Sequence, residues 1–129
     1  MATPASVSES AFFEAVEDRT ADSFEELRDL LDQGIDPNIR NGNDSTALHL
    51  LADMTWGERI CKKAQLLIDR GADVNARDET QKTPLHLATL WQNSRMEEVL
   101  VEAGADRDAR DMYEMTAEDW RHFDGGGFF

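Results

Sequence analysis

The chain has 129 residues, of which 40% are hydrophobic, so it suits a single packed domain rather than a disordered chain. Its formal net charge of −14 at pH 7 opposes direct binding to nucleic-acid phosphates and to acidic membranes. No stretch approaches the roughly 20 consecutive apolar residues of a membrane-spanning helix. We therefore expect neither nucleic acid nor a membrane as a direct partner.

The single cysteine and the N-terminal residues favour a reducing compartment. Cys61 has no second cysteine with which to form an intrachain disulfide. Residues 1–6 lack the basic residues and the apolar run of a secretory signal. We expect a cytoplasmic protein that is monomeric when free.

The first part of the chain predicts a pair of helices. Residues 1–8 are small and polar, and we expect them to be disordered. A first helix is predicted to begin at Ser8 or Ser10, since serine is a favoured helix N-cap. A second helix should run from about Asp22, another N-cap candidate, to Gln33 and should bury one apolar stripe.

A turn and a second helix pair follow. Residues 38–45 contain Asn41-Gly42 and Asn43-Asp44, which are strong turn signals. Thr46 is predicted to open a short helix, and a returning helix is expected over residues 59–70. Residues 53–60 connect the two helices.

The third and fourth segments repeat this order. Residues 75–82 are predicted to form a turn, and helices are expected over 84–91 and 95–103, because proline at position 84 is well tolerated at a helix start. A further turn at 110–115 and a short helix at 116–120 come next. The chain then ends with residues 124–129, a glycine-rich run with two aromatic residues that predicts a flexible tail.

Two landmarks recur in register along these segments. Thr83-Pro84-Leu85-His86-Leu87-Ala88 has an earlier copy, Thr46-Ala47-Leu48-His49-Leu50, that lies 37 residues before it. Gly71-Ala72-Asp73 returns 33 residues later as Gly104-Ala105-Asp106. This motif and this period resemble those of the ankyrin repeat.

The resemblance implies an all-α solenoid of about three and a half to four helix-turn-helix repeats with projecting hairpin fingers. The repeats would form one domain over residues 9–123, with boundaries at about 9–37, 38–74, 75–107 and 108–123. Four extra residues in the connection 53–60 would account for the longer second period. The last repeat would be a polar cap, as solenoids require.

No pattern in the sequence indicates catalysis, a cofactor or a metal. The Cys and His residues lack the close spacings of a zinc site, and we expect the two motif histidines to satisfy buried polar groups instead. The glycine run near the C-terminus precedes no helix, so it does not match a phosphate-binding loop. We therefore expect a protein that is not an enzyme.

Ankyrin repeats usually bind proteins through their finger tips and the exposed positions of their first helices. The resemblance places the partner-binding residues at Asn43, Ser45, Met54, Trp56, Arg77, Glu79, Lys82, Leu90, Trp91, Arg110, Met112, Tyr113 and Met115. Trp and Tyr are common interface hot spots, so Trp91 and Tyr113 are predicted anchors. Arg77, Lys82 and Arg110 would form a basic stripe in the middle of the groove.

Two functions remain open. The first is a non-catalytic interaction module that binds, and inhibits or protects, a protein partner through its concave groove and finger tips. The second rests on the charge distribution, because residues 9–36 carry −8 and residues 97–124 carry −7. Such acidic ends could mimic nucleic acid and block a nucleic-acid-binding protein or a nuclease, as an immunity or anti-defence inhibitor would. They could also serve only as soluble caps of the solenoid.

Overall fold

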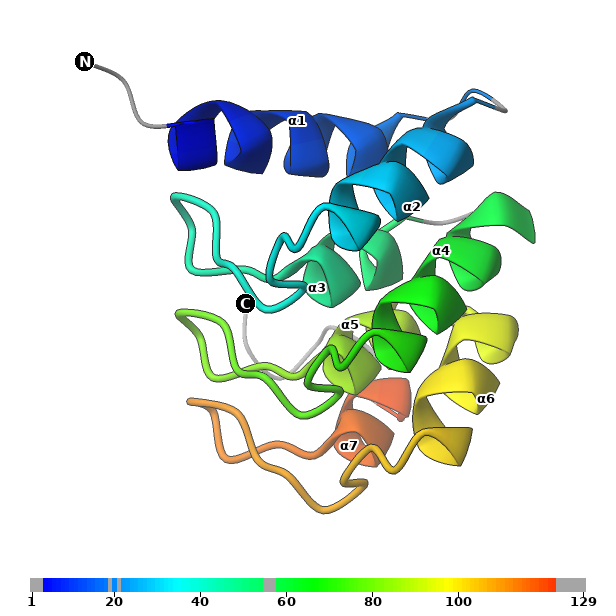
Figure 1. The fold of residues 1–129 in the computed structure, drawn as a ribbon. Coiled ribbons are helices and arrows are strands. Elements are labelled where there is room, and N and C mark those ends of the chain that lie inside the picture. Colours follow the sequence, from blue (N-terminus) through cyan, green and yellow to red (C-terminus); the bar gives the residue numbers. More distant parts are fainter. Residues whose placement is uncertain (1–3, 19, 21, 55–57, 123–129) are drawn as a thin grey trace.

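The computed structural model describes residues 4–18, 20, 22–54 and 58–122, and over these residues it contains seven α-helices and no strand (Figure 1). The helices are α1 (Pro4–Glu17), α2 (Ser23–Asp32), α3 (Ala47–Ala52), α4 (Glu58–Asp69), α5 (Pro84–Leu90), α6 (Ser94–Glu102) and α7 (Ala117–Arg121).

The helices stack in two rows. Helices α1, α3, α5 and α7 contact one another in that order, and α2, α4 and α6 form the second row. The loops that precede α3, α5 and α7 all project to the same side, the left of Figure 1. We call them finger 2 (residues 38–45), finger 3 (residues 75–82) and finger 4 (residues 110–115). The predicted all-α solenoid with hairpin fingers is thereby confirmed.

The recurring threonine and histidine explain why each inner helix begins where it does. Thr83 is extended (φ −90°, ψ 166°), and its Oγ1 accepts a hydrogen bond from the backbone N–H of His86. The Nδ1 atom of His86 accepts the N–H of Thr83 at 3.2 Å, which closes a reciprocal cap. Thr46 and His49 repeat this arrangement at the start of α3. Aspartate replaces histidine at the start of α7, where Asp119 accepts the N–H of Thr116 at 3.0 Å.

The second helices end at a left-handed glycine. Gly34 has φ +101°, a conformation that is unfavourable for residues that have a side chain. Its N–H donates to the carbonyl of Leu31. In finger 2 the left-handed residue is Asp44 (φ +62°), although Gly42 lies in the same turn.

The core runs the length of the stack between the two helix rows. Its largest fully buried apolar side chains come from both rows and include Phe12, Leu27, Leu48, Leu51, Leu67, Met96 and Leu100. Each element therefore buries one face against the next repeat, which is how a short solenoid obtains a continuous core.

The beginning of the chain differs from the sequence-based prediction. Helix α1 begins at Pro4 rather than at Ser8 or Ser10, and it includes residues 4–8, for which we expected disorder. Proline favours this position because the first N–H of a helix has no intrahelical acceptor. Asp22 precedes α2 as predicted, but its side chain forms no capping hydrogen bond.

Lys63 is a buried lysine that sequence reasoning did not single out. Its side chain lies on α4 and its Nζ donates to the carbonyls of Ala15 (2.8 Å), Val16 (3.3 Å) and Asp18 (2.6 Å). These are acceptors at the end of α1 that lack helical donors, and a cation is favourable at a helix C-terminus. Lys63 therefore joins the second repeat to the first.

Candidate functional site: the finger face and the end of helix α5

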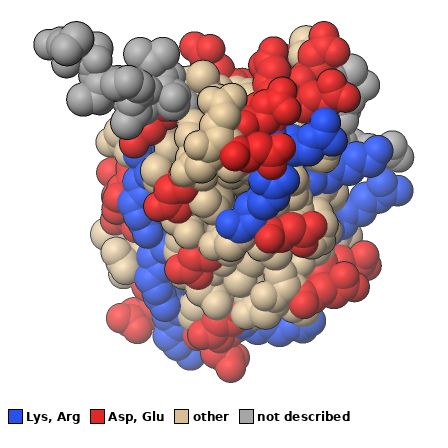
Figure 2. Space-filling view, viewed as in Figure 1, with Lys and Arg blue, Asp and Glu red and all other residues tan. Residues whose placement is uncertain are grey.

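Three arginines at the same position of successive fingers form a ladder. The Nη1 of Arg40 donates to the carbonyl of Arg77 at 2.5 Å, and the Nη1 of Arg77 donates to the carbonyl of Arg110 at 2.6 Å. Arg110 donates to Glu114 within its own finger at 2.7 Å. Figure 2 shows a column of basic side chains down the finger side of the molecule. The ladder thus holds the fingers together and presents an exposed basic surface.

Asparagines at the bases of fingers 2 and 3 add a second set of links. The side chain of Asn38 donates to the carbonyl of Gly71 at 3.1 Å and accepts the N–H of Asp73 at 2.6 Å. Asn75 accepts the N–H of Asp106 at 2.7 Å in the same way one repeat later. The finger face is consequently held by hydrogen bonds between repeats as well as within each turn.

Lys82 does not belong to the exposed basic stripe that the sequence predicts. Its side chain is only 12% exposed, and its Nζ lies 3.5 Å from a carboxylate oxygen of Asp111. The ammonium also lies over two rings, 4.9 Å from the centroid of Tyr113 and 5.0 Å from that of Trp120. Ring faces attract cations, so the Lys82 ammonium packs between fingers 3 and 4 and is largely withdrawn from solvent. Among the predicted residues, this contact brings Lys82 and Tyr113 together.

Asp111 is the centre of this cluster, and its side chain is fully buried. Oδ2 accepts the indole N–H of Trp120 at 2.6 Å, while Oδ1 accepts the backbone N–H groups of Tyr113 (2.9 Å) and Met115 (3.1 Å). Burial by itself raises the pKa of Asp111. These hydrogen bonds and the Lys82 ammonium outweigh it, and the pKa lies below the ordinary value. The carboxylate therefore stays ionised and fixes finger 4.

Trp91 follows α5 and is 49% exposed. Its indole N–H donates to a carboxylate oxygen of Asp53 at 2.6 Å, and Asp53 is the C-cap residue of α3 in the preceding repeat. The ring is therefore held in one orientation while much of its surface faces solvent. Leu90, the last residue of α5, is 39% exposed beside it in sequence.

Within the described residues, the exposed large hydrophobic side chains occur at two places. Leu90 and Trp91 lie at the end of α5, and Met112 (56% exposed) and Tyr113 (48% exposed) lie in finger 4. All four were predicted as partner-binding residues. The N–H of Met112 donates to the carbonyl of Thr80 in finger 3, which leads into the start of α5, whereas Leu90 and Trp91 lie at the end of that helix.

The remaining predicted residues fall into three groups. Asn43 and Glu79 are exposed, whereas Ser45, Met54 and Met115 are half-buried. Trp56 lies outside the described residues.

Trp120 was not predicted, yet its ring packs edge-on to Tyr113, with 6.2 Å between the ring centroids, and thereby supports it. Only the aromatic character of Trp120 could have drawn attention to it, because its neighbours in sequence are polar.

The described residues offer no group of three or more His, Cys, Asp or Glu side chains that could hold a metal ion. Burial raises the pKa of the Cys61 thiol, which makes the nucleophilic thiolate scarcer at neutral pH. No described helix is both long enough and apolar enough to cross a bilayer.

The family model for ankyrin repeats, in three copies, matches residues 12–111. The chain belongs to the ankyrin repeat family, and its repeats form a protein–protein interaction module. Ankyrin repeat proteins are generally non-catalytic binding modules. No curated protein matches the sequence.

Proposed function

We propose that this protein binds a folded protein partner across fingers 2 to 4 and the end of α5, and that it inhibits or protects that partner. The observation that carries the proposal is a set of exposed apolar residues, at the end of α5 and in finger 4, on a molecule whose fingers also present an arginine column. Trp91 is held by Asp53, and finger 4 by the buried Asp111.

The apolar residues would supply most of the affinity. A large side chain that stays exposed in the free protein gains free energy when a partner removes it from water. Aromatic anchors of this kind often contribute about 2–4 kcal/mol each to binding. Because Trp91 and Tyr113 are already fixed by neighbours, less side-chain entropy is lost when they bind.

The arginine column would orient the partner. Arg40, Arg77 and Arg110 are exposed and aligned, so they favour an acidic segment on the partner and would speed association at low salt. Exposed ion pairs contribute only about 0–1 kcal/mol each, so we expect the column to affect the rate of association more than the lifetime of the complex.

The experiment starts with capture of the partner from source-cell lysate and its identification by mass spectrometry. Surface plasmon resonance at low and high salt then compares Trp91→Ala with the double reversal Glu25→Lys/Glu26→Lys on α2. We expect Trp91→Ala to raise the dissociation rate, and the reversal to alter mainly the salt dependence. Gln65→Ala, at an exposed position on α4, is the matched control and should change neither.

The second candidate, an acidic mimic of nucleic acid, is favoured by the surface of α2. Glu25, Glu26, Asp29 and Asp32 are all exposed on this helix. A mimic would lose binding when these acids are reversed and would bind much less tightly at high salt. If the Glu25→Lys/Glu26→Lys protein fails to bind while Trp91→Ala binds normally, the mimic replaces the groove as the proposed function.

A further inference from the structure

Among the described residues, no helix packs on the outer face of α6 in the way that α4 packs on α2 and α6 packs on α4. Helix α2 packs on α4, and α4 packs on α6. Within the described part of the chain, the fourth repeat supplies only α7, which packs on α5. The described row of second helices therefore has one helix fewer than the described row of first helices.

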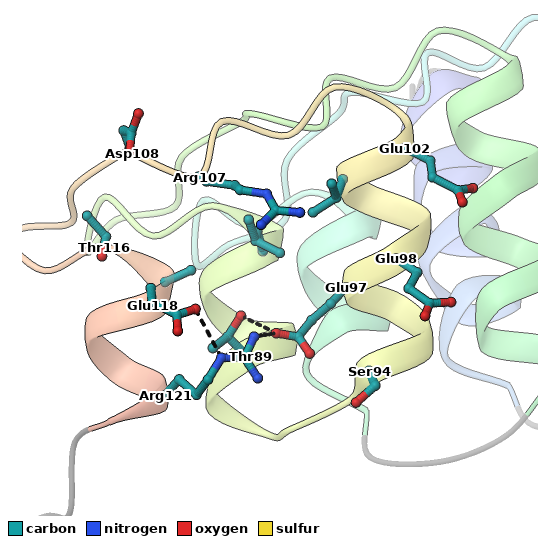
Figure 3. Close-up of a pocket in the computed structure, with 13 residues that line it drawn as sticks. Thr89, Ser94, Glu97, Glu98, Glu102, Arg107, Asp108, Thr116, Glu118 and Arg121 are labelled. Atoms are coloured by element: carbon teal, nitrogen blue, oxygen red, sulfur yellow. Dashed lines mark hydrogen bonds and ion pairs between the residues drawn. The ribbon is translucent and has the colours of Figure 1, made fainter.

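A cleft of about 820 Å³ lies at the position of the missing neighbour (Figure 3). Helix α6 lines it with residues at the i, i+3, i+4, i+7 and i+8 positions of a single face: Ser94, Glu97, Glu98, Val101 and Glu102. Its other walls come from α5, α7 and the loop before finger 4. Because these α6 residues lie on one face of the helix, they form the kind of surface that a neighbouring helix would cover.

The acids on this surface differ in how they are balanced. Glu97 accepts a hydrogen bond from the Thr89 hydroxyl at 2.8 Å and forms an ion pair with Arg121. Arg121 also bonds Glu118 at 3.0 Å, and this contact lowers the pKa of Glu118. These groups converge in the middle of Figure 3. Both acids at the centre of the cleft are thus paired with the same guanidinium.

The rim of the cleft is not neutralised in this way. Glu98 and Glu102 are exposed, and neither has a basic partner among the described residues. The whole lining carries five acidic and two basic side chains. Val101, which is half-buried, lies between the two rim acids on α6.

We propose that this cleft docks a helix of another protein, with a small apolar stripe over Val101 and with lysine or arginine residues facing Glu98 and Glu102. The helix would take the position of the next second helix of the stack, where helix axes pack about 8–10 Å apart. This site is separate from the finger face, and its occupant does not depend on the partner proposed there.

Charge argues against a second copy of this chain as the occupant. Stacking the start of one molecule on the end of another would bring α2 toward α6. The exposed acids of α2 include Glu25 and Glu26, so acidic side chains would oppose Glu98 and Glu102. Like charges across an interface are unfavourable, whereas a basic helix is complementary.

The test uses a synthetic helical peptide of about 16 residues, long enough to form a marginal helix, with leucine on one face and lysine on its flanks. A second peptide has glutamate at every lysine position. Fluorescence anisotropy measures affinity for the full chain, and amide NMR shifts locate the contact. We expect the lysine peptide alone to bind and to shift the signals of Glu98, Val101 and Ala117.

Charge reversal provides the matched comparison. Glu98→Lys/Glu102→Lys should weaken the lysine peptide by about tenfold or more, whereas Glu25→Lys/Glu26→Lys should change its affinity by less than about twofold. Thermal unfolding shows whether each variant folds. If Glu98→Lys/Glu102→Lys does not fold, Glu98→Gln/Glu102→Gln replaces it in the comparison. Equal weakening by both reversals, equal binding of the two peptides, or shifts confined to other surfaces would overturn the proposal.

Two further outcomes would assign the cleft to a different occupant and refute the proposal. One is a stable dimer in analytical ultracentrifugation that the Glu98→Lys/Glu102→Lys protein no longer forms. The other is a gain of about tenfold or more in peptide affinity when residues 124–129 are removed, which would show that the chain's own C-terminus competes for the cleft.

Discussion

The Nε2 atom of His86 lies 2.9 Å from the carbonyl oxygen of Met115, so an imidazole in the third repeat holds finger 4 of the next. The opposite ring nitrogen accepts the N–H of Thr83. This pair of contacts requires a neutral ring with its proton on Nε2. Burial lowers the pKa of His86, and the hydrogen bond to Met115 and the charge of Asp111 only partly oppose it. His49 makes the equivalent contact with Lys82 at 2.8 Å, and burial lowers its pKa too.

Stability should therefore depend on these histidines near neutral pH. Their folded-state pKa values lie below the unfolded value of about 6.5, so their contribution is complete above that pH and is lost as pH falls through the folded pKa. We expect His86→Gln to destabilise the protein by about 1–3 kcal/mol at high pH and to flatten the loss on acidification. Urea titrations at several pH values measure both effects, and an unchanged pH slope in the variant would contradict the prediction.

Replacing Asp111 in finger 4 should destabilise the protein more than replacing Asp78, the equivalent residue of finger 3. Asp111→Asn replaces the carboxylate that balances the Lys82 ammonium with a neutral amide. We expect the free energy of unfolding to fall by about 2–4 kcal/mol. Asp78, one repeat earlier, accepts backbone N–H groups through Oδ1, which asparagine can still provide, so Asp78→Asn is the matched control. Chemical unfolding measures both variants. The folded pKa of Asp111 is lowered, so its contribution is present above about pH 4 and disappears as pH falls through that folded pKa.

Truncation of the core should unfold much of this short stack. Leu85 is 4% exposed and Leu100 is fully buried, so Leu85→Ala and Leu100→Ala should each cost about 2–5 kcal/mol. Leu90→Ala removes the same atoms from a position that is 39% exposed, and it should cost much less. Thermal melts followed by circular dichroism compare the three proteins. Similar melting temperatures for all of them would show that the core is assigned incorrectly.

Loss of the Lys63 ammonium should weaken the attachment of α1. Lys63→Met keeps the apolar stem but leaves up to three carbonyls without this donor, and we expect a cost of about 2–4 kcal/mol. Lys62→Met changes an exposed neighbour and should cost no more than about 0.5 kcal/mol. Limited proteolysis reports the local effect, because a loosened α1 should be cleaved first near its C-terminal end. Equal protease resistance in the two variants would argue against the capping role of Lys63.

The sequence by itself determined the repeat fold, because the interactions that specify each repeat are local and their motifs recur along the chain. The Thr83–His86 cap connects residues three apart, and Gly34 ends a helix through its own backbone. Such features specify helices and turns before any distant contact forms. The same repeats also place Trp91 and Tyr113 at positions that the solenoid leaves exposed, and the structure agrees.

Only the tertiary structure decided what these side chains meet. Trp91 donates to Asp53 across 38 positions of the chain, and Lys63 reaches the end of α1 across 45 or more. From the sequence, Lys82 is predicted to be one more basic residue of the groove. In the structure its ammonium lies between fingers 3 and 4, in contact with Asp111 and two aromatic rings. A repeat period states which positions face the next repeat, but it does not state which pair of charges will meet there. Those pairings depend on side-chain packing between repeats, and packing becomes defined only when the stack forms.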